Sequence, residues 1–324
     1  MQLPPALRYA IEDELTAYDV RELTRAASEL SDQYRTRQPA QGRFIRSELH
    51  RRAYIATRLP ATYAAVSATL ATLAHTHPDK IRSLLDLGAG SGSASWAAQA
   101  HFASLATCTL IERDQELITL GQKLAANADN ALLKTAQWHT ADLSTQQALP
   151  ASDLVLASYA LNELGEDTAI ATLHRAWAAA RVALVVVEPG TPAGFALIKK
   201  FRDALIEKGA HLLAPCPHAA TCPLPADDWC HFAQRINRTS LHRSLKGGEL
   251  GHEDEKFSYL IFTKEPLTPA PARILRHPQR RPGHVHLSLC TVDGLRQQTV
   301  TRSDKSHWKN ARKTQWGDPW PISN

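Results

Sequence analysis

The segment 86–92 (DLGAGSG) constrains the fold of this chain more than any other feature. A short apolar run, IRSLLDL, leads into it, and a run with helical character, SASWAAQAHFA, follows it. Glycine permits backbone conformations that other residues avoid, and it lets a ligand approach the main chain closely. A helix that begins directly after such a turn presents free N–H groups to a ligand. The segment therefore predicts a ligand-binding turn between a strand and a helix.

Apolar runs alternate with amphipathic runs from residue 80 onward. This alternation is typical of a mainly parallel sheet covered by helices on both faces. We therefore predict a Rossmann-like α/β fold. The expected later strands have the sequences CTLIERD, AQWHTADL, SDLVLASYAL, RVALVVVEPG and KFSYLIFTK.

Three regions are expected along the chain. Residues 1–78 have the 3.6-residue periodicity of helices, and Pro60 is expected to interrupt one of them. Residues 79–264 form the α/β domain, which carries a Cys-, Pro- and His-containing insertion at 211–256. Residues 265–324 begin with a proline-containing linker and continue as two strands around a Val-Asp-Gly turn, which predicts a small β appendage.

Two acidic residues support a cofactor role for the glycine turn. Glu112 ends the next expected strand, where a carboxylate accepts hydrogen bonds from ribose hydroxyls, and Asp142 follows the third strand at a position suited to an adenine amino group. A dinucleotide site has similar spacings, but its glycines usually follow the pattern G-x-G-x-x-G. The pattern D-x-G-x-G-x-G with a downstream acid resembles class I methyltransferases, which use S-adenosylmethionine (SAM). The SAM-binding residues expected on this basis are Asp86, Gly88, Gly90, Gly92, Glu112 and Asp142.

Four of the five cysteines form a candidate metal site. Cys216, Cys222 and Cys230 lie within a short loop-like segment, and Cys290 lies well downstream. Four thiolates can close a tetrahedral zinc site or hold a four-iron cluster. The spacings match neither zinc ribbons nor bacterial ferredoxins, so the residues alone leave the metal open. His218 and His231 are alternative ligands, whereas Cys108 is expected to pack in the core.

The segment CPHAATCPLPADDWCHF, placed after a SAM-type domain and followed by a lone cysteine beside a basic tail, is similar to the methyltransferase-like Rsm-twenty-two family. The resemblance extends from AYIATRLPATYAAV to Cys290. It implies a class I SAM fold, a [4Fe-4S] cluster on Cys216, Cys222, Cys230 and Cys290, and binding to small-subunit ribosomal RNA during ribosome assembly. Because the chain starts without an Arg/Ser-rich leader and lacks a long apolar run, we expect a bacterial, cytoplasmic protein without a membrane partner.

The excess positive charge of the chain is confined to its C-terminal part. From Glu265 onward there are ten Lys and Arg against four Asp and Glu, while the preceding residues are nearly balanced. Cations interleaved with Trp308 and Trp316 suit phosphate contact and base stacking, although a solvated tail with packed tryptophans has the same composition. The candidate RNA-binding residues are Arg273, Arg276, Arg280, Arg281, Lys305, Lys309, Arg312 and Lys313.

Catalysis is left open by the sequence. The stretch SYALNEL after the expected fourth strand lacks the Asn/Asp-Pro-Pro-aromatic turn of amino-directed base methyltransferases. Tyr159, Asn162 and Glu163 are candidates for lining a substrate pocket there. We therefore expect an assembly factor with a methyltransferase fold. The alternatives are an active RNA methyltransferase, a zinc-stabilised methyltransferase with a non-ribosomal substrate, and an iron–sulfur sensor that links RNA binding to iron supply.

Overall fold

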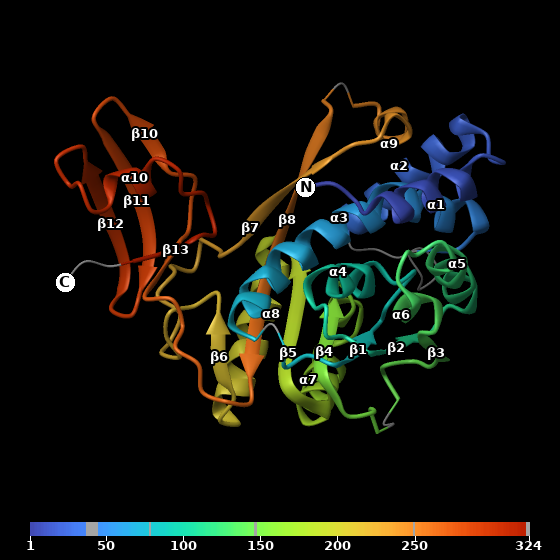
Figure 1. Ribbon diagram of the computed structural model, residues 1–324, viewed down its shortest axis with the longest axis horizontal. Helices are drawn as coiled ribbons and strands as arrows, with labels where there is room; N and C mark the ends of the chain where they lie inside the picture. The colour runs from blue at the N-terminus through green and yellow to red at the C-terminus, as the bar shows by residue number, and fades with distance from the viewer. Residues whose placement is uncertain (37–44, 78, 146–147, 249, 322–324) are drawn as a thin grey trace. The chain divides into compact units, whose positions relative to one another are not determined.

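The computed structural model describes residues 1–36, 45–77, 79–145, 148–248 and 250–321. It divides into two compact units, which are described in turn: one comprises Met1–Gln147 and Gln234–Glu255, the other Ala148–Ala233 and Lys256–Asn324. Figure 1 gives the element labels. Within the described residues, no helix combines the length and the apolar character needed to cross a bilayer.

The first unit begins with helices, of which α3 (Glu48–Thr76) is the longest. Ser47 caps it by accepting a hydrogen bond from the backbone N–H of His50. The predicted interruption at Pro60 is wrong, because the helix continues through this residue. Proline removes one backbone donor, and here the loss is tolerated because most of the surrounding residues are buried. The other two N-terminal helices are α1 (Pro5–Leu15) and α2 (Val20–Thr36).

The three strands of the first unit run parallel in the order β3-β2-β1. Parallel strands end at the same edge of a sheet, so the residues that follow them gather there. The register aligns Leu87 with Ile111 and Glu112 with Thr140, which places the glycine turn beside Glu112. The elements are β1 (Ser83–Leu87), α4 (Ser93–His101), β2 (Thr107–Glu112), α5 (Gln115–Ala126), α6 (Ala131–Lys134), β3 (Gln137–Thr140) and, in the returning segment, α9 (Ser240–Leu245).

The second unit contains a mixed sheet with the strand order β4-β5-β8-β6. Strand β5 pairs parallel with β4 and antiparallel with β8, which in turn pairs antiparallel with β6. The run Ala183–Val187 is fully buried, as expected for a strand covered on both faces. The elements are β4 (Ser152–Ser158), the 3-10 turn η2 (Leu161–Glu163), α7 (Glu166–Ala179), β5 (Ala180–Pro189), α8 (Pro192–Glu207) and β6 (His211–Ala214). The residues of β7 (Phe232–Asn237) and β8 (His252–Thr263) are divided between the two units.

The C-terminal residues of the second unit form a separate five-stranded antiparallel sheet, drawn in red in Figure 1. Strands β11 (His284–Thr291) and β12 (Gly294–Thr301) form the expected hairpin, in which Thr291 pairs with Gly294. Gly294 has φ of 112°, which the turn requires and side-chain-bearing residues rarely adopt. The remaining elements, too short to be seen as periodic patterns, are β9 (Ala272–Ile274), β10 (Gln279–Arg281), α10 (Trp308–Ala311) and β13 (Pro319–Trp320).

Candidate functional site

The glycine turn between β1 and α4 has the backbone that its sequence predicts. Gly88, Gly90 and Gly92 all lie at positive φ, at 64°, 56° and 85°. The N–H of Ala89 donates to the carbonyl of Ile111 at 3.0 Å, which ties the turn to the end of β2. Because any side chain at these three positions would strain the backbone, the glycines are required by conformation as well as by ligand access.

Glu112 holds the glycine turn directly. Its Oε2 accepts a hydrogen bond from the N–H of Gly90 at 2.9 Å, and its Oε1 accepts from the N–H groups of Arg113 and Asp114 at 2.8 and 2.9 Å. The side chain is 8% exposed. The carboxylate is thus fixed at the carboxyl end of β2, where it faces the backbone of the turn.

Asp86 is buried beneath the turn. It is fully buried, and Oδ2 accepts a hydrogen bond from the hydroxyl of Ser95 at 2.9 Å. Burial raises the pKa of Asp86 to about 7, because desolvation disfavours the carboxylate. Since Ser95 lies in α4, this pair joins β1 to the helix that follows the turn. The structure gives Asp86 a supporting position below the turn.

Asp142 lies on the surface after β3. Its Oδ1 accepts a hydrogen bond from the N–H of Ser144 at 2.8 Å, and this bond lowers the pKa of Asp142. The N–H of Ala141 donates to the carbonyl of Glu112 at 3.0 Å, so the loop that carries Asp142 begins beside the end of β2. The structure therefore brings Glu112 and the glycines into contact, with Asp142 on the neighbouring loop.

Two aromatic residues at the glycine turn escaped the sequence analysis. A Cβ atom on Gly90 would lie 3.2 Å from the hydroxyl oxygen of Tyr54 in α3. A Cβ on Gly92 would lie 3.3 Å from the indole of Trp138 in β3, and one on Gly121 only 2.5 Å from it. The sequence analysis gave neither aromatic residue a role at the turn, and only their closeness in the folded chain reveals one.

The end of β4, in the second unit, carries a strained and well-bonded turn. Tyr159 has φ of 55°, which is unusual for a residue with a side chain. The backbone N–H and the Nδ2 of Asn162 donate to the two carboxyl oxygens of Glu188, at 3.2 and 2.6 Å. Glu188 is fully buried, and burial raises its pKa to about 8. Sequence reasoning named Tyr159 and Asn162 but missed Glu188, which lies near the end of β5.

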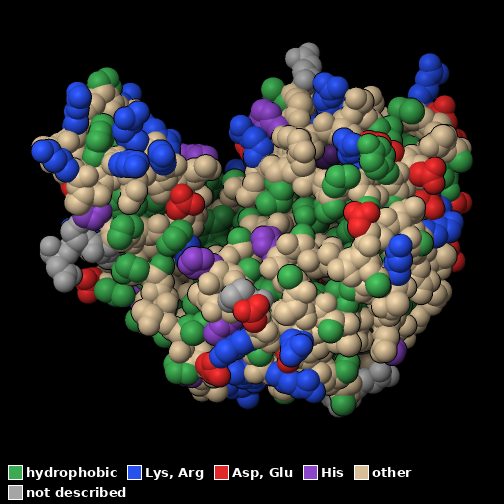
Figure 2. Space-filling model, in the orientation of Figure 1, with side chains coloured by type: hydrophobic (Ala, Val, Ile, Leu, Met, Phe, Trp, Pro, Cys, Tyr) green, Lys and Arg blue, Asp and Glu red, His purple; other side chains and the backbone are tan. Residues whose placement is uncertain are grey.

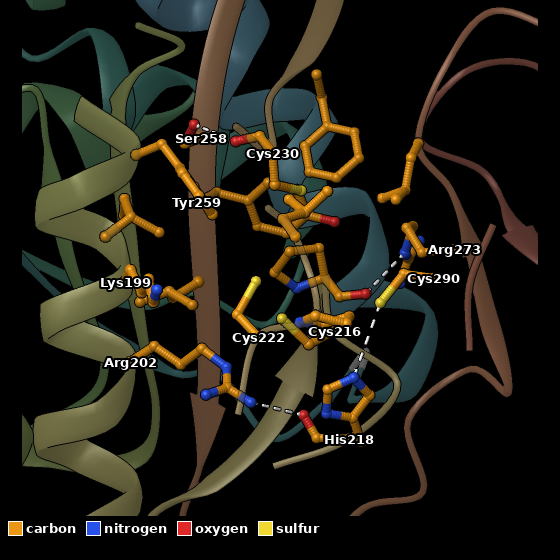
Figure 3. A pocket seen from close by; sticks show the side chains of 18 residues that line it. Lys199, Arg202, Cys216, His218, Cys222, Cys230, Ser258, Tyr259, Arg273 and Cys290 are labelled. Carbon is orange, nitrogen blue, oxygen red and sulfur yellow. Dashed lines mark hydrogen bonds between the residues drawn. The ribbon is translucent and has the colours of Figure 1, made fainter. Parts of the chain in front are cut away.

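The four predicted metal-binding cysteines line one small cavity of about 40 Å³, entirely within the second unit. Cys216 follows β6, the next two lie in the loop before β7, and Cys290 is delivered by β11 of the C-terminal sheet. Figure 3 shows sulfur atoms from these separate segments turned toward a common space. The structure therefore brings together residues that are up to 74 positions apart in the chain. The two cysteines in the loop before β7 are Cys222 and Cys230.

Burial dominates the electrostatics of this cysteine pocket. Desolvation raises the pKa of Cys216 and, further, of Cys230, and it raises the pKa of Cys290 to about 12. Each of these thiols is also disfavoured as a thiolate by neighbouring cysteines. Within the described part of the chain, no group of three or more His, Cys, Asp or Glu residues is placed to hold a metal ion.

The histidines near the pocket take different positions. His218 lines the cavity, and its Nε2 lies 3.8 Å from the sulfur of Cys290. His231 stacks on Trp229 with ring centroids 5.2 Å apart and meets the edge of Trp316 at 4.8 Å. Cys108 is buried in the first unit, where its sulfur lies 3.5 Å from the hydroxyl of Ser95, outside this pocket.

The eight candidate RNA-binding cations separate into two groups. Arg273 is only 3% exposed and donates to the carbonyls of Pro215 and Gly317 at 3.0 Å each, so its guanidinium is engaged inside the protein. Arg276 is half-buried and bonds Asp228. The other six are exposed, and Figure 2 shows Lys and Arg side chains gathered over the C-terminal sheet. The exposed cations are Arg280, Arg281, Lys305, Lys309, Arg312 and Lys313, joined by Arg296 and Arg302, which the sequence analysis missed.

The two tryptophans of the basic region are partly packed. Trp308 rests against the core of the C-terminal sheet, which includes Trp320. Trp316 meets the rings of His231 and His277, each at 4.8 Å. Much of each indole is therefore used inside the protein.

A glycine turn after β1, an acid at the end of β2 and parallel strands flanked by helices define the fold as that of class I SAM methyltransferases. The chain belongs to the family described as mitochondrial small ribosomal subunit Rsm22, whose model matches residues 48–321. Both the fold and the family predicted from the sequence are confirmed.

Curated relatives are similar over most of this chain. The human ribosome assembly protein METTL17, mitochondrial, is 28% identical over 83% of the chain and 62% of its own length. The Rsm22-cox11 tandem protein 2, mitochondrial, of Schizosaccharomyces pombe is 26% identical over 83% of the chain and 43% of its own length. The chain thus spans less than two thirds of the length of these relatives. Among solved structures, it resembles the Synechocystis magnesium protoporphyrin IX methyltransferase with bound SAH at 15% identity, covering 63% of this chain and 84% of that one, with a TM-score of 0.42.

The expectation of a bacterial, cytoplasmic protein is contradicted by these relatives. The human and fission yeast proteins are named as mitochondrial, as is the family itself. The expectation rested on the residues with which the given sequence begins, and these carry no information about a leader. The family assignment rests on the match over residues 48–321 and is unaffected.

Proposed function

We propose that this chain is a SAM-binding, methyltransferase-like factor that binds small-subunit ribosomal RNA and assists assembly of the small ribosomal subunit. The observation that carries the SAM part is the contact between Glu112 and the N–H of Gly90. It holds three positive-φ glycines beside an acid at the end of β2, which suits the ribose and the methionine part of SAM. The ribosomal part is supported by the family and by the names of its relatives.

We further propose that the cysteine pocket holds a [4Fe-4S] cluster. Four thiols facing one cavity form a donor set that suits iron–sulfur chemistry, and the cavity contains no carboxylate among its lining residues. Cys216, Cys222, Cys230 and Cys290 would be the ligands, and burial would shield the centre from solvent. When bound, the cluster would link the loop before β7 to the C-terminal sheet, so binding would contribute to folding.

Zinc is the alternative occupant of this pocket. Four thiolates around one zinc ion at about 2.3 Å must lie within roughly 4 Å of one another. A four-iron cluster is held by the same number of thiolates. Iron, sulfide and zinc analysis of anaerobically purified protein decides between the two occupants.

The exposed cations of the C-terminal sheet are the proposed RNA contact. At least eight Lys and Arg side chains are exposed there, while Asp293 is the exposed acid between Glu265 and Pro321. Such a surface attracts phosphate groups and makes binding sensitive to salt. Its position beside Cys290 would make the RNA surface depend on the state of the pocket.

Sedimentation through sucrose gradients tests the ribosomal proposal. A tagged copy, expressed in cells of the species that encodes it, should sediment with the small subunit or its precursors, and ribonuclease should release it. A variant with four exposed cations replaced should shift to the top of the gradient. Sedimentation as free protein at low as well as moderate salt would contradict the proposal.

Methyl transfer is the second candidate function, and the turn after β4 favours it. Glu188 fixes both the backbone and the side chain of Asn162, so the amide oxygen of Asn162 stays available as an acceptor for a substrate N–H. The test is transfer of labelled methyl groups from SAM to small-subunit RNA. A loss of transfer in Asn162→Ala with unchanged SAM binding would support catalysis. Absence of transfer by the wild-type protein would exclude methyl transfer to this RNA as the function.

A further inference from the structure

Two buried arginines flank the four cysteines. Arg202 from α8 and Arg273 from β9 both line the pocket, and each is 3% exposed. Figure 3 shows them on opposite sides, with the sulfurs of Cys216 and Cys222 between them in this view. Neither arginine belongs to the cysteine motif, and their positions result from the fold alone.

The pocket has no matching negative charge of its own. Its lining residues include no Asp or Glu, and Lys199 and His218 are the further basic side chains. Arg273 donates to two carbonyl oxygens, and no ion pair to an acid is found for it in the described residues. A buried guanidinium without a counter-charge is expensive, because desolvation is uncompensated.

Arg202 also organises the loop that carries the cysteines. Its Nη2 donates to the carbonyls of His218, at 3.0 Å, and Ala220, which lie between Cys216 and Cys222. Its Nη1 pairs with Asp203 at 2.7 Å, but that carboxylate is 49% exposed and is not among the lining residues of the pocket. The Nε remains without a hydrogen-bond partner among the described residues, although it is buried.

We infer that Arg202 and Arg273 are built-in counter-charges for a dianionic centre on the four cysteines. This inference rests on the proposed cluster. Four thiolates around a doubly positive core leave a net charge of about −2, which two guanidinium groups balance. The arginines are therefore positioning residues: they stabilise the ligated state and favour the cluster charge that they match.

The reduction potential distinguishes a counter-charge from a merely structural role. The potential of an iron–sulfur cluster depends on nearby charge, so removing one cation disfavours the more negative, reduced cluster. Arg202→Gln and Arg273→Gln should lower the midpoint potential and speed loss of iron to a chelator at least about fivefold. Arg273→Lys keeps the charge but loses the two carbonyl bonds. It should restore the potential while iron loss remains faster than in wild type.

The experiment uses the full chain, purified anaerobically, with iron and sulfide analysis, potentiometric titration and circular dichroism on every variant. Arg181→Gln is the matched control, because Arg181 is exposed and lies outside the pocket. Wild-type protein without iron and sulfide would overturn the cluster proposal itself. A different result is possible if the wild type contains iron and sulfide. Folded arginine variants with the wild-type potential and the wild-type rate of iron loss would then overturn the role of the arginines but not the cluster proposal.

Discussion

The carboxylate of Glu112 accepts a hydrogen bond from the backbone N–H of Gly90 at 2.9 Å. This contact joins the end of β2 to the turn between β1 and α4, so one side chain holds two parts of the proposed cofactor site together. A ligand that replaces the Gly90 N–H at this carboxylate must donate comparable hydrogen bonds to it, as ribose hydroxyls do.

Glu112→Gln should weaken SAM binding. The amide retains one acceptor where the carboxylate holds three backbone N–H groups, and charge-assisted bonds of this kind are each worth about 1.5–3 kcal/mol. We expect the dissociation constant measured by calorimetry to rise at least about tenfold. Glu116→Gln, an exposed change in the adjacent helix, is the control and should bind SAM normally. Equal binding by both variants would exclude the role given to Glu112.

Gly121→Ala should disturb the wall of the same site. The added Cβ would lie 2.5 Å from the indole of Trp138 and 3.1 Å from the backbone carbon of Ser91. Overpacking of this kind typically costs about 1–3 kcal/mol, so the melting temperature should fall. Gly165→Ala is the control, because its Cβ would meet nothing within 4 Å. The prediction fails if the two variants have the same melting temperature.

Cys290→Ser should remove most of the iron from anaerobically purified protein and increase protease cleavage of the C-terminal sheet. The reason is that this cysteine is the one proposed ligand on that sheet. Cys108→Ala removes a thiol from the first unit and should leave the iron content unchanged. Iron retained at the wild-type level in Cys290→Ser would contradict the assignment of the fourth ligand.

Replacing Arg281, Lys305, Lys309 and Lys313 with Gln should weaken binding to small-subunit RNA and reduce its dependence on salt. Each lost phosphate contact lowers the slope of log K against log salt by about 0.7–0.9, so the slope should fall by about 3. The control replaces four exposed cations elsewhere, namely Arg21, Arg25, Lys134 and Lys208. An equal loss of slope in the control would make the effect one of net charge alone.

Glu188 should make stability fall as pH rises. Burial raises its pKa from 4.5 to about 8, so the folded chain keeps a proton that the unfolded chain releases. This contribution to the free energy of unfolding is fully present below the pKa that Glu188 has in the unfolded chain. It decreases by about 1.4 kcal/mol per pH unit as the pH rises from that value to about 8. Thermal melts of Glu188→Gln should change less between pH 7 and 8 than those of wild type. Asp86→Asn should flatten the curve at lower pH, because the pKa of Asp86 is raised to about 7.

Local sequence signals predicted the glycine turn and the β11–β12 hairpin because each depends on neighbouring residues, whereas a cluster that includes Cys290 was implied by the family resemblance. Glycine at positive φ and a Val-Asp-Gly turn are short-range conformational requirements. The α/β alternation is likewise visible as a change of period along the chain. These features need no knowledge of the tertiary structure.

Other features depend on which residues the fold brings together. Arg273 resembles its neighbours in a basic stretch, yet the pairing of β9 with β11 directs it into the protein. Tyr54 reaches the glycine turn from a distant helix, and Pro60 is retained inside that helix by burial. Burial and long-range contact decide these positions, and neither is encoded in local spacing.

The position of β11 also fixes an order of events during synthesis. Cys216, Cys222 and Cys230 leave the translating ribosome well before Cys290, which must also pair with β9 and β12 to reach its place. A centre that needs all four thiols could be completed only after β11 has emerged and paired with its neighbours. Assembly of such a centre would therefore follow the folding of the C-terminal sheet.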